Sequence, residues 1–190
     1  EKHCELFMLA DPLDLPSLCG SRINYDKYST DKTKFSIGFA SPVGQLLSCN
    51  HIYSQFIFIE DAPATIKKLE SRKLRLQSLS AYSRSNMMAK NATEDFLNDA
   101  IGAQQMPVKA HFNILAWTDE KEKLQDIRSQ CAAALTQLDA TPKIETLGAP
   151  QIFWAGIPGN AADLPVNETF DTFSNQACCF LNLETNYRSS

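Results

Sequence analysis

Basic side chains crowd one short window in the first half of the chain. Only Glu70 opposes the cations there, which are Lys67, Lys68, Arg72, Lys73 and Arg75. Cations at helical spacing can contact the phosphates of DNA or of anionic lipid head groups. No aromatic residues are interleaved with them, although stacking on bases usually needs such residues. The window is interpreted as an anion-binding helix face or, alternatively, as an ordinary solvated face.

A glycine-bearing loop, GIPGN at residues 156–160, follows the apolar stretch QIFWA. A P-loop needs G-x-x-x-x-G-K-[ST], and neither this pattern nor G-x-G-x-x-G occurs in the chain. Pro and Gly instead stand in the order that suits the central positions of a type II turn. We predict a turn without a cofactor or catalytic site. The alternative is a loop that contacts a neighbouring domain, through Trp154, Gly156, Pro158, Gly159 and Asn160.

Cysteine and histidine residues offer little chemistry at their spacing. The six cysteines include no C-x-x-C pair, and we expect free thiols in a reducing compartment. The candidate metal ligands are Cys49 and His51, on one face of a predicted strand, with His3, Cys4 and His111. Core packing explains that spacing as well as a site does, so no metal is predicted. Nothing near the adjacent Cys178 and Cys179 favours a reactive thiolate, and no nucleophile is predicted.

The elements that position these residues begin with strands. The apolar segment 3–9 is followed by a loop rich in proline and glycine that we expect to be exposed. Residues 34–40 (KFSIGFA) alternate with period two, residues 41–44 (SPVG) are typical of a turn, and residues 45–59 are rich in branched and aromatic side chains. This pattern predicts a hairpin whose second arm is a long central strand.

Helices are expected at residues 61–84, 93–104, 119–138 and 168–182. The first has Asp61 as its N-cap and Pro63 in its first turn, and the second has Thr93 as its cap. The third has an acidic first turn with Asp119 and Glu122, followed by apolar residues at three- and four-residue spacing.

Strands are also predicted at residues 109–117 (KAHFNILAW) and 151–155 (QIFWA), with a short edge strand near Ile144 and Leu147. Trp117 and Trp154 end two of these strands and are expected to pack near the same edge of the core. Hairpins first and a strand-helix-strand unit later indicate an α+β fold, with a mostly antiparallel sheet and helices packed on one face.

Composition limits the function classes. The 190 residues are 44% hydrophobic and 21% charged, which suits one domain with its own core. A net charge of −4 argues against nucleic-acid binding over the whole surface. No apolar run approaches the length of a membrane-spanning helix, and no leader pattern opens the chain, so we expect a soluble chain. Because it begins without Met and ends without a change in composition, we also expect it to be part of a longer protein.

Several separated stretches, in the same order, resemble a region of the TraG-type conjugation ATPases of Bacteroides conjugative transposons, which are relatives of the large ATPase of type IV secretion systems. The stretches are SPVGQLLSCNHIYSQ (41–55), AYSRSN (81–86), KAHFNILAW (109–117), WAGIPGNAADLP (154–165) and ETNYRSS (184–190). The region that they resemble lies just upstream of the P-loop motor.

The resemblance implies that residues 1–190 form one non-catalytic accessory domain, with residues 1–33 leading into it. It also implies a longer ATPase that uses ATP and Mg, is hexameric, and lies peripherally at the cytoplasmic face of the inner membrane. Expected partners are the motor domain, sister subunits and conjugation channel proteins. No catalytic residue carries over, since the chain holds no P-loop. The alternative is a stand-alone α+β module that binds nucleic acid through residues 67–75, and a free-standing enzyme ranks below both.

Overall fold

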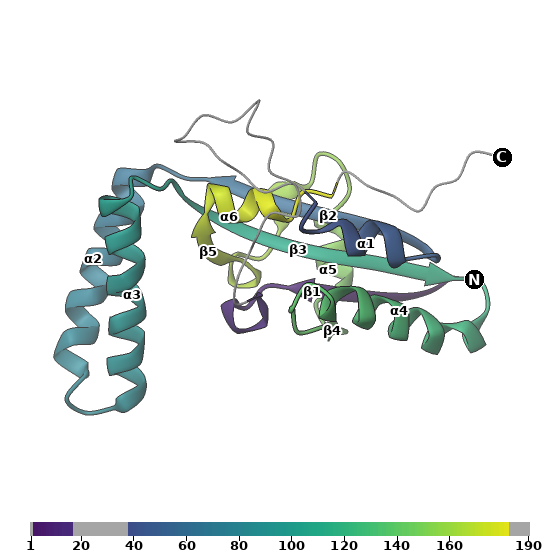
Figure 1. The fold of residues 1–190 in the computed structure, drawn as a ribbon, viewed down its shortest axis with the longest axis horizontal. Helices are drawn as coiled ribbons and strands as arrows, with labels where there is room; N and C mark the ends of the chain where they lie inside the picture. Colours follow the sequence, from purple (N-terminus) through teal and green to yellow (C-terminus); the bar gives the residue numbers. More distant parts are fainter. Residues whose placement is uncertain (1, 17–37, 183–190) are drawn as a thin grey trace.

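The computed structural model describes residues 2–16 and 38–182, which form an α+β fold around an antiparallel sheet (Figure 1). The strands are β1 (His3–Leu9), β2 (Asn50–Ile59), β3 (Pro107–Thr118), β4 (Lys143–Glu145) and β5 (Phe170–Phe173). Their order across the sheet is β2-β3-β1-β4, and β5 also pairs with β3. The predicted fold class is confirmed.

Strand β3 is the centre of the sheet and most of its side chains are buried. One edge of β3 pairs with β2 from Val108 to Trp117. The other edge pairs with β1 over residues 112–118 and with β5 over residues 107–110. Strands β1 and β5 therefore lie end to end along one edge of β3. The strand predicted at residues 109–117 is confirmed.

Strand β2 lies at an edge of the sheet, so the prediction of a central strand that starts at residue 45 is wrong. Helix α1 (Ser41–Leu46) takes the place of the predicted SPVG turn, with Pro42 in its first turn. Proline is tolerated there because the backbone N–H of a first-turn residue has no hydrogen-bond partner within the helix, so its absence costs nothing. Of the predicted first arm, residues 34–37 lie outside the described residues, and residues 38–40 form a bend and turn.

Helices α1, α4 (Leu124–Thr136) and α6 (Ser174–Cys179) cover one face of the sheet (Figure 1). The apolar stripe predicted for α4 is confirmed, because Ile127, Cys131 and Leu135 are buried in this core. Phe112 of β3 is 1% exposed and stacks on Phe180 at a ring-centroid distance of 4.5 Å. This face therefore contains the larger of the two apolar clusters among the described residues.

The predicted strand-helix-strand unit is formed by β3, α4 and β4. Strands β3 and β4 both run antiparallel to β1, so they are parallel to each other with β1 between them. The edge strand expected near Ile144 is confirmed, whereas Leu147 lies beyond it. The capped start expected before α4 is wrong, since Asp119 forms an ion pair with Lys2, with Nζ and Oδ1 2.7 Å apart.

Helix α5 (Ala149–Ala155) covers part of the opposite face, where Ile152 and Ala155 pack against Leu6 and Phe56. The strand predicted at residues 151–155 is therefore wrong. A short apolar run fits a helix or a strand equally well, and here Pro150 in the first turn favours the helix. The helix predicted at residues 168–182 is also wrong at its start, because Phe170 and Phe173 belong to β5, and α6 ends at Cys179.

Helices α2 (Ala62–Leu79) and α3 (Arg84–Gly102) form a hairpin that projects from one end of the sheet (Figure 1). We call this hairpin the helical arm. Helix α2 ends before the predicted Arg84, and α3 begins well before the predicted Thr93. Thr93 is not a cap but a buried residue inside α3, whose Oγ1 donates to the Ala89 carbonyl at 2.8 Å.

Short 3-10 helices connect the larger elements, at Pro12–Asp14, Lys121–Lys123, Ala161–Asp163 and Val166–Glu168. None of the helices within the described residues is long and apolar enough to cross a membrane.

Candidate functional site

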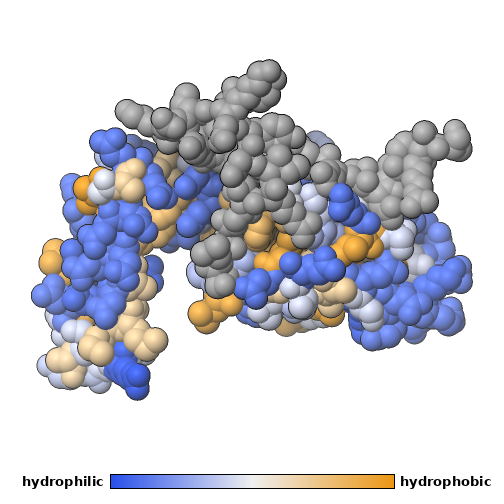
Figure 2. Space-filling view, viewed as in Figure 1, coloured by the Kyte–Doolittle hydropathy of each residue, from blue (hydrophilic) through white to orange (hydrophobic). Residues whose placement is uncertain are grey.

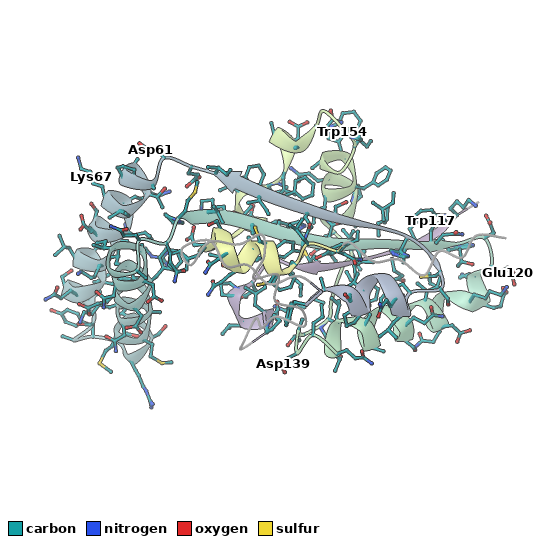
Figure 3. The ribbon with its side chains drawn as sticks, turned by 45° about the horizontal axis from the view of Figure 1, so that its top comes forward. Asp61, Lys67, Trp117, Glu120, Asp139 and Trp154 are labelled. Atoms are coloured by element: carbon teal, nitrogen blue, oxygen red, sulfur yellow. The ribbon has the colours of Figure 1, made fainter. Side chains whose placement is uncertain are left out.

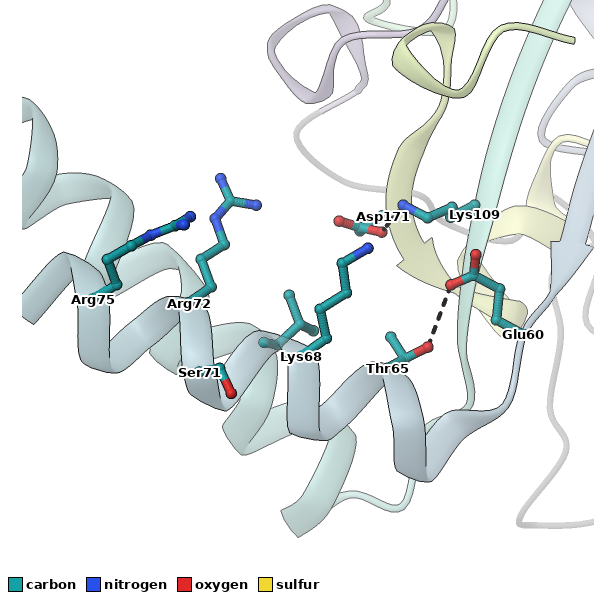
Figure 4. A pocket seen from close by; sticks show the side chains of 9 residues that line it. Glu60, Thr65, Lys68, Ser71, Arg72, Arg75, Lys109 and Asp171 are labelled. Carbon is teal, nitrogen blue, oxygen red and sulfur yellow. Dashed lines mark hydrogen bonds and ion pairs between the residues drawn. The ribbon is translucent and has the colours of Figure 1, made fainter.

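A basic cleft of about 610 Å³ lies where the helical arm meets the sheet (Figure 4). Its residues come from α2, β3, β5 and the end of β2, so segments far apart in the sequence contribute to it. Lys68, Arg72 and Arg75 point into the cleft from α2, and Lys109 and Asp171 face them. The three α2 residues share one helix face because they are spaced four and three residues apart.

The structure separates the five predicted basic residues into two groups. Lys68, Arg72 and Arg75 line the basic cleft. Lys67 lies on another side of α2 and points away from the sheet (Figure 3). Lys73 turns toward α3, where its Nζ lies 3.9 Å from a carboxylate oxygen of Glu94. Only Lys68, Arg72 and Arg75 of the five therefore lie together in the basic cleft, and anion binding by these residues stays a prediction.

Charge in the basic cleft is unbalanced. Asp171 neutralises Lys109 across the β3–β5 pair, with Nζ and Oδ1 2.9 Å apart. Glu60 accepts a hydrogen bond from Thr65 at 3.3 Å. No carboxylate of the described residues lies within ion-pair distance of Lys68, Arg72 or Arg75. The cleft can therefore bind an anion.

A second concave surface, the apolar groove, lies on the sheet face that α5 covers. Its volume is about 280 Å³. Its residues are Leu6, Ile52, Ser54, Asn113, Leu115, Ile152, Phe153, Gly156, Ile157 and Pro158. Ile52 is 49% exposed and Phe153 is 52% exposed, although both side chains are large and apolar. Water therefore covers apolar surface that a partner could bury.

The GIPGN loop closes one end of the apolar groove and is the type II turn predicted from the sequence. The Asn160 N–H donates to the Ile157 carbonyl at 3.0 Å, and Gly159 has a φ of 101°. Only glycine adopts that φ without strain. Gly156 and Pro158 line the groove, whereas Trp154, Gly159 and Asn160 lie beside it.

Trp154 is held by its polar edge while its ring stays half exposed. Its Nε1 donates to Asp163 at 2.8 Å, and its carbonyl accepts from the Asn160 side chain at 3.3 Å. The expectation that Trp154 and Trp117 pack near one edge is wrong. Trp154 belongs to α5, whereas Trp117 lies at the far end of β3 (Figure 3).

A family model matches residues 44–163, which include β2, the helical arm, β3, α4 and α5. The model describes the CagE, TrbE, VirB family, a component of the type IV transporter system. This chain belongs to that family. The CagE, TrbE, VirB match confirms the resemblance at the level of a type IV secretion ATPase relative. The narrower likeness to TraG of Bacteroides stays a prediction. No curated protein matches the chain.

In this member of the CagE, TrbE, VirB family, the candidate metal ligands do not gather. No three His, Cys, Asp or Glu side chains of the described residues are placed to hold a metal ion. His111 is buried with Asn113 and is not near Cys4, which lies at the other end of the β1–β3 pair. Its Nδ1 lies 2.7 Å from the Glu168 carbonyl, and burial lowers its pKa. Burial therefore favours the neutral form of His111 in the core.

Cys49 is the most activated thiol among the described cysteines. Its pKa is lowered by a hydrogen bond from Cys131 and by the neighbouring His51, while partial burial acts in the opposite direction. The His51 Nδ1 lies 3.0 Å from the Cys49 carbonyl. Burial raises the pKa of Cys178. Cys49 packs at the margin of the core and lines neither the basic cleft nor the apolar groove.

The sequence did not predict the residues that complete the basic cleft and the apolar groove. Glu60 follows the end of β2, Lys109 belongs to β3 and Asp171 belongs to β5. Only the pairing of β3 with β5 brings Lys109 and Asp171 together. Ile52 and Phe153 complete the apolar groove from β2 and α5. The one local signal was the alternation of β2, which places Ile52 and Ser54 on the same face as Phe56.

Proposed function

We propose that this chain is a non-catalytic accessory domain of a conjugative-transfer ATPase of the TraG type. It works by docking, and the apolar groove is its contact with the motor domain of the same longer protein. ATP and Mg would bind to that motor. Sister subunits and channel proteins are the further partners, at the cytoplasmic face of the inner membrane.

The groove carries this proposal. Exposed apolar side chains from β2 and α5 gather around one hollow, rather than standing singly on the surface as they do on most proteins. The groove is lined by few polar groups, so it favours an apolar protein segment over a charged ligand. Membership of a family of type IV transporter components supports a partner inside that machinery.

The coding sequence downstream of Ser190 offers the first test, because a G-x-x-x-x-G-K-[ST] motif is expected there. The encoded motor can then be expressed separately and titrated with this chain in a calorimeter. Phe153→Ser should weaken binding by about three- to tenfold, because Phe153 is 52% exposed and burying that half of the side chain contributes about half of the roughly 1.5–3 kcal/mol of a full phenyl ring.

The matched control is Leu147→Ser, which removes an apolar side chain that is 95% exposed and lies outside the groove. This variant should bind like the unaltered chain. Equal affinity of the motor for Phe153→Ser and Leu147→Ser would show that the groove is not the docking surface.

The basic cleft supports a second candidate function, a module that binds DNA. The observation that supports it is that Lys68, Arg72 and Arg75 have no ion-pair partner among the described residues. Reversing all three to Glu should abolish DNA binding and remove its salt dependence, since each phosphate contact contributes about −0.9 to the slope of log K against log salt. An unchanged, salt-sensitive affinity would exclude the cleft as the DNA site.

A further inference from the structure

The free end of the helical arm carries large side chains that are exposed rather than packed inside the arm. Tyr82 is 85% exposed and Met88 is 62% exposed, and Leu79 and Met87 beside them are also exposed. We call these four residues the arm tip. Figure 1 shows the arm tip as the part of the arm farthest from the sheet. In Figure 2, apolar tan atoms gather toward the same end of a mostly hydrophilic arm.

Packing inside the helical arm is concentrated near the sheet. Leu69 of α2 and Leu97 and Ala100 of α3 are the buried apolar residues of the arm. The Phe96 ring stacks on Phe173 of β5 at a centroid distance of 4.3 Å, which fixes the base of the arm. The side chains of the arm tip contribute little to this packing, so an internal structural role does not account for them.

Between Glu70 and Glu94 the charged side chains of the arm are all positive. No Asp or Glu occurs between Glu70 and Glu94, and that stretch holds five cations, Arg72, Lys73, Arg75, Arg84 and Lys90. Glu94 pairs with Lys73 and Lys90 at its boundary. Arg84 is the first residue of α3, two residues after Tyr82, and is exposed. Arg72 and Arg75 line the basic cleft nearer the sheet, so the cation at the tip is Arg84, which has no ion-pair partner among the described residues. The tip therefore combines exposed apolar groups with one positive charge.

We propose that the arm tip inserts into the surface of an anionic lipid bilayer. Leu, Met and Tyr side chains can enter the region between head groups and acyl chains, and Arg84 beside them attracts anionic lipids. Tyrosine favours this interface because its ring is apolar and its hydroxyl stays hydrated. Only the arm tip enters the bilayer surface, and the arm does not span the bilayer.

A bilayer fits the arm tip better than a protein or a nucleic acid does. A stable protein interface buries roughly 800 Å² on each partner, which is more than a few side chains at a hairpin end can supply. Nucleic acid offers phosphates for Arg84, but it offers no apolar surface for the methionines. The inference rests on the membrane-side placement in the proposed function, and it does not depend on the apolar groove.

Flotation of the whole chain with vesicles tests this inference. We expect binding to vesicles of phosphatidylglycerol and phosphatidylcholine in equal parts, weaker binding to phosphatidylcholine alone, and release at high salt. The double variant Tyr82→Ser with Met88→Ser should lower the partition coefficient by roughly tenfold or more. Arg84→Glu should lower it by roughly tenfold. All three residues are exposed, so these variants should fold.

Two controls remove comparable groups from elsewhere on the molecule. Leu147→Ser removes an exposed apolar side chain, and Lys121→Glu reverses an exposed charge outside the arm. Both should partition like the unaltered chain. The inference is overturned if anionic vesicles do not float the chain, or if the tip variants behave like the controls. Binding of the tip to duplex DNA without vesicle binding would overturn it in favour of nucleic acid. A chain that docks to its motor but ignores vesicles would retain the proposed function and lose only this inference.

Discussion

Removal of the helical arm should leave the sheet domain folded. Strands β2 and β3 stay paired as far as Ile59 and Val108, which is where the arm leaves the sheet. A short Ser-Asn-Gly-Lys linker between Glu60 and Pro107 would join the two strands as an ordinary hairpin. The two apolar clusters of the described residues contain no residue from the arm, so the deletion leaves both intact.

The energetic terms of this deletion nearly cancel. The stacked pair of Phe96 and Phe173 is lost, which costs about 1 kcal/mol beyond the area that the rings bury. Phe173 is 3% exposed and would lose part of its cover, at roughly another 1 kcal/mol. Shortening the connection about tenfold recovers roughly 2 kcal/mol of loop-closure entropy. The free energy of unfolding should therefore change by less than about 2 kcal/mol.

Urea denaturation followed by tryptophan fluorescence measures this change. Trp117 and Trp154 both lie in the sheet domain, so the signal of the deletion variant reports on the same core. Phe112→Ala is the comparison, because removing this buried ring should cost about 3–5 kcal/mol. A deletion variant that unfolds without cooperativity, or that loses more stability than Phe112→Ala, would refute the view that the arm is an independent projection.

Two further predictions concern titratable groups in the sheet domain. Because burial lowers the pKa of His111 below its usual value near 6.5, folding disfavours its protonated form, and stability should fall as the pH drops below that value. His111→Gln should show a shallower loss between pH 7.5 and 5.5 in the same urea assay, and an equal loss would assign the pH dependence to other groups. Cys49 should react with iodoacetamide faster than Cys178 at neutral pH, since its pKa is lowered and that of Cys178 is raised. Cys131→Ala should slow Cys49 by removing its hydrogen-bond donor, and mass spectrometry of the modified peptides would show whether it does.

Local sequence patterns predicted β3 and α4 well and failed on the short elements α1, α5 and β5. Strand β3 and helix α4 are long enough for the apolar pattern to repeat several times, so each pattern identifies one type of element. Helices α1 and α5 have few residues, and each contains a proline that suits a helix start as well as a turn. Strand β5 shows the limit most clearly. The spacing of Phe170 and Phe173 fits a helix, and the segment is a strand because the edge of β3 is open beyond β1.

The candidate sites show the same division between local and long-range information. The charge of α2 was visible as a run of basic residues, but the choice of Lys68, Arg72 and Arg75 for the cleft depends on how the arm leaves the sheet. The turn at Pro158 was visible because its chemistry is local. The apolar groove beside it was not, since Ile52 and Phe153 meet only after β2 and α5 have packed on the same sheet face.

The way the arm is joined to the sheet explains how the apolar groove and the arm tip can act independently. The arm is inserted between β2 and β3, whose pairing continues up to the insertion point and fixes the register of the sheet. Changes in the arm tip therefore do not shift Ile52 or Leu115, which lie well inside the paired region and line the groove. Docking through the groove and membrane contact through the tip can each be altered without the other. A tip variant that weakened binding of the motor would contradict this separation.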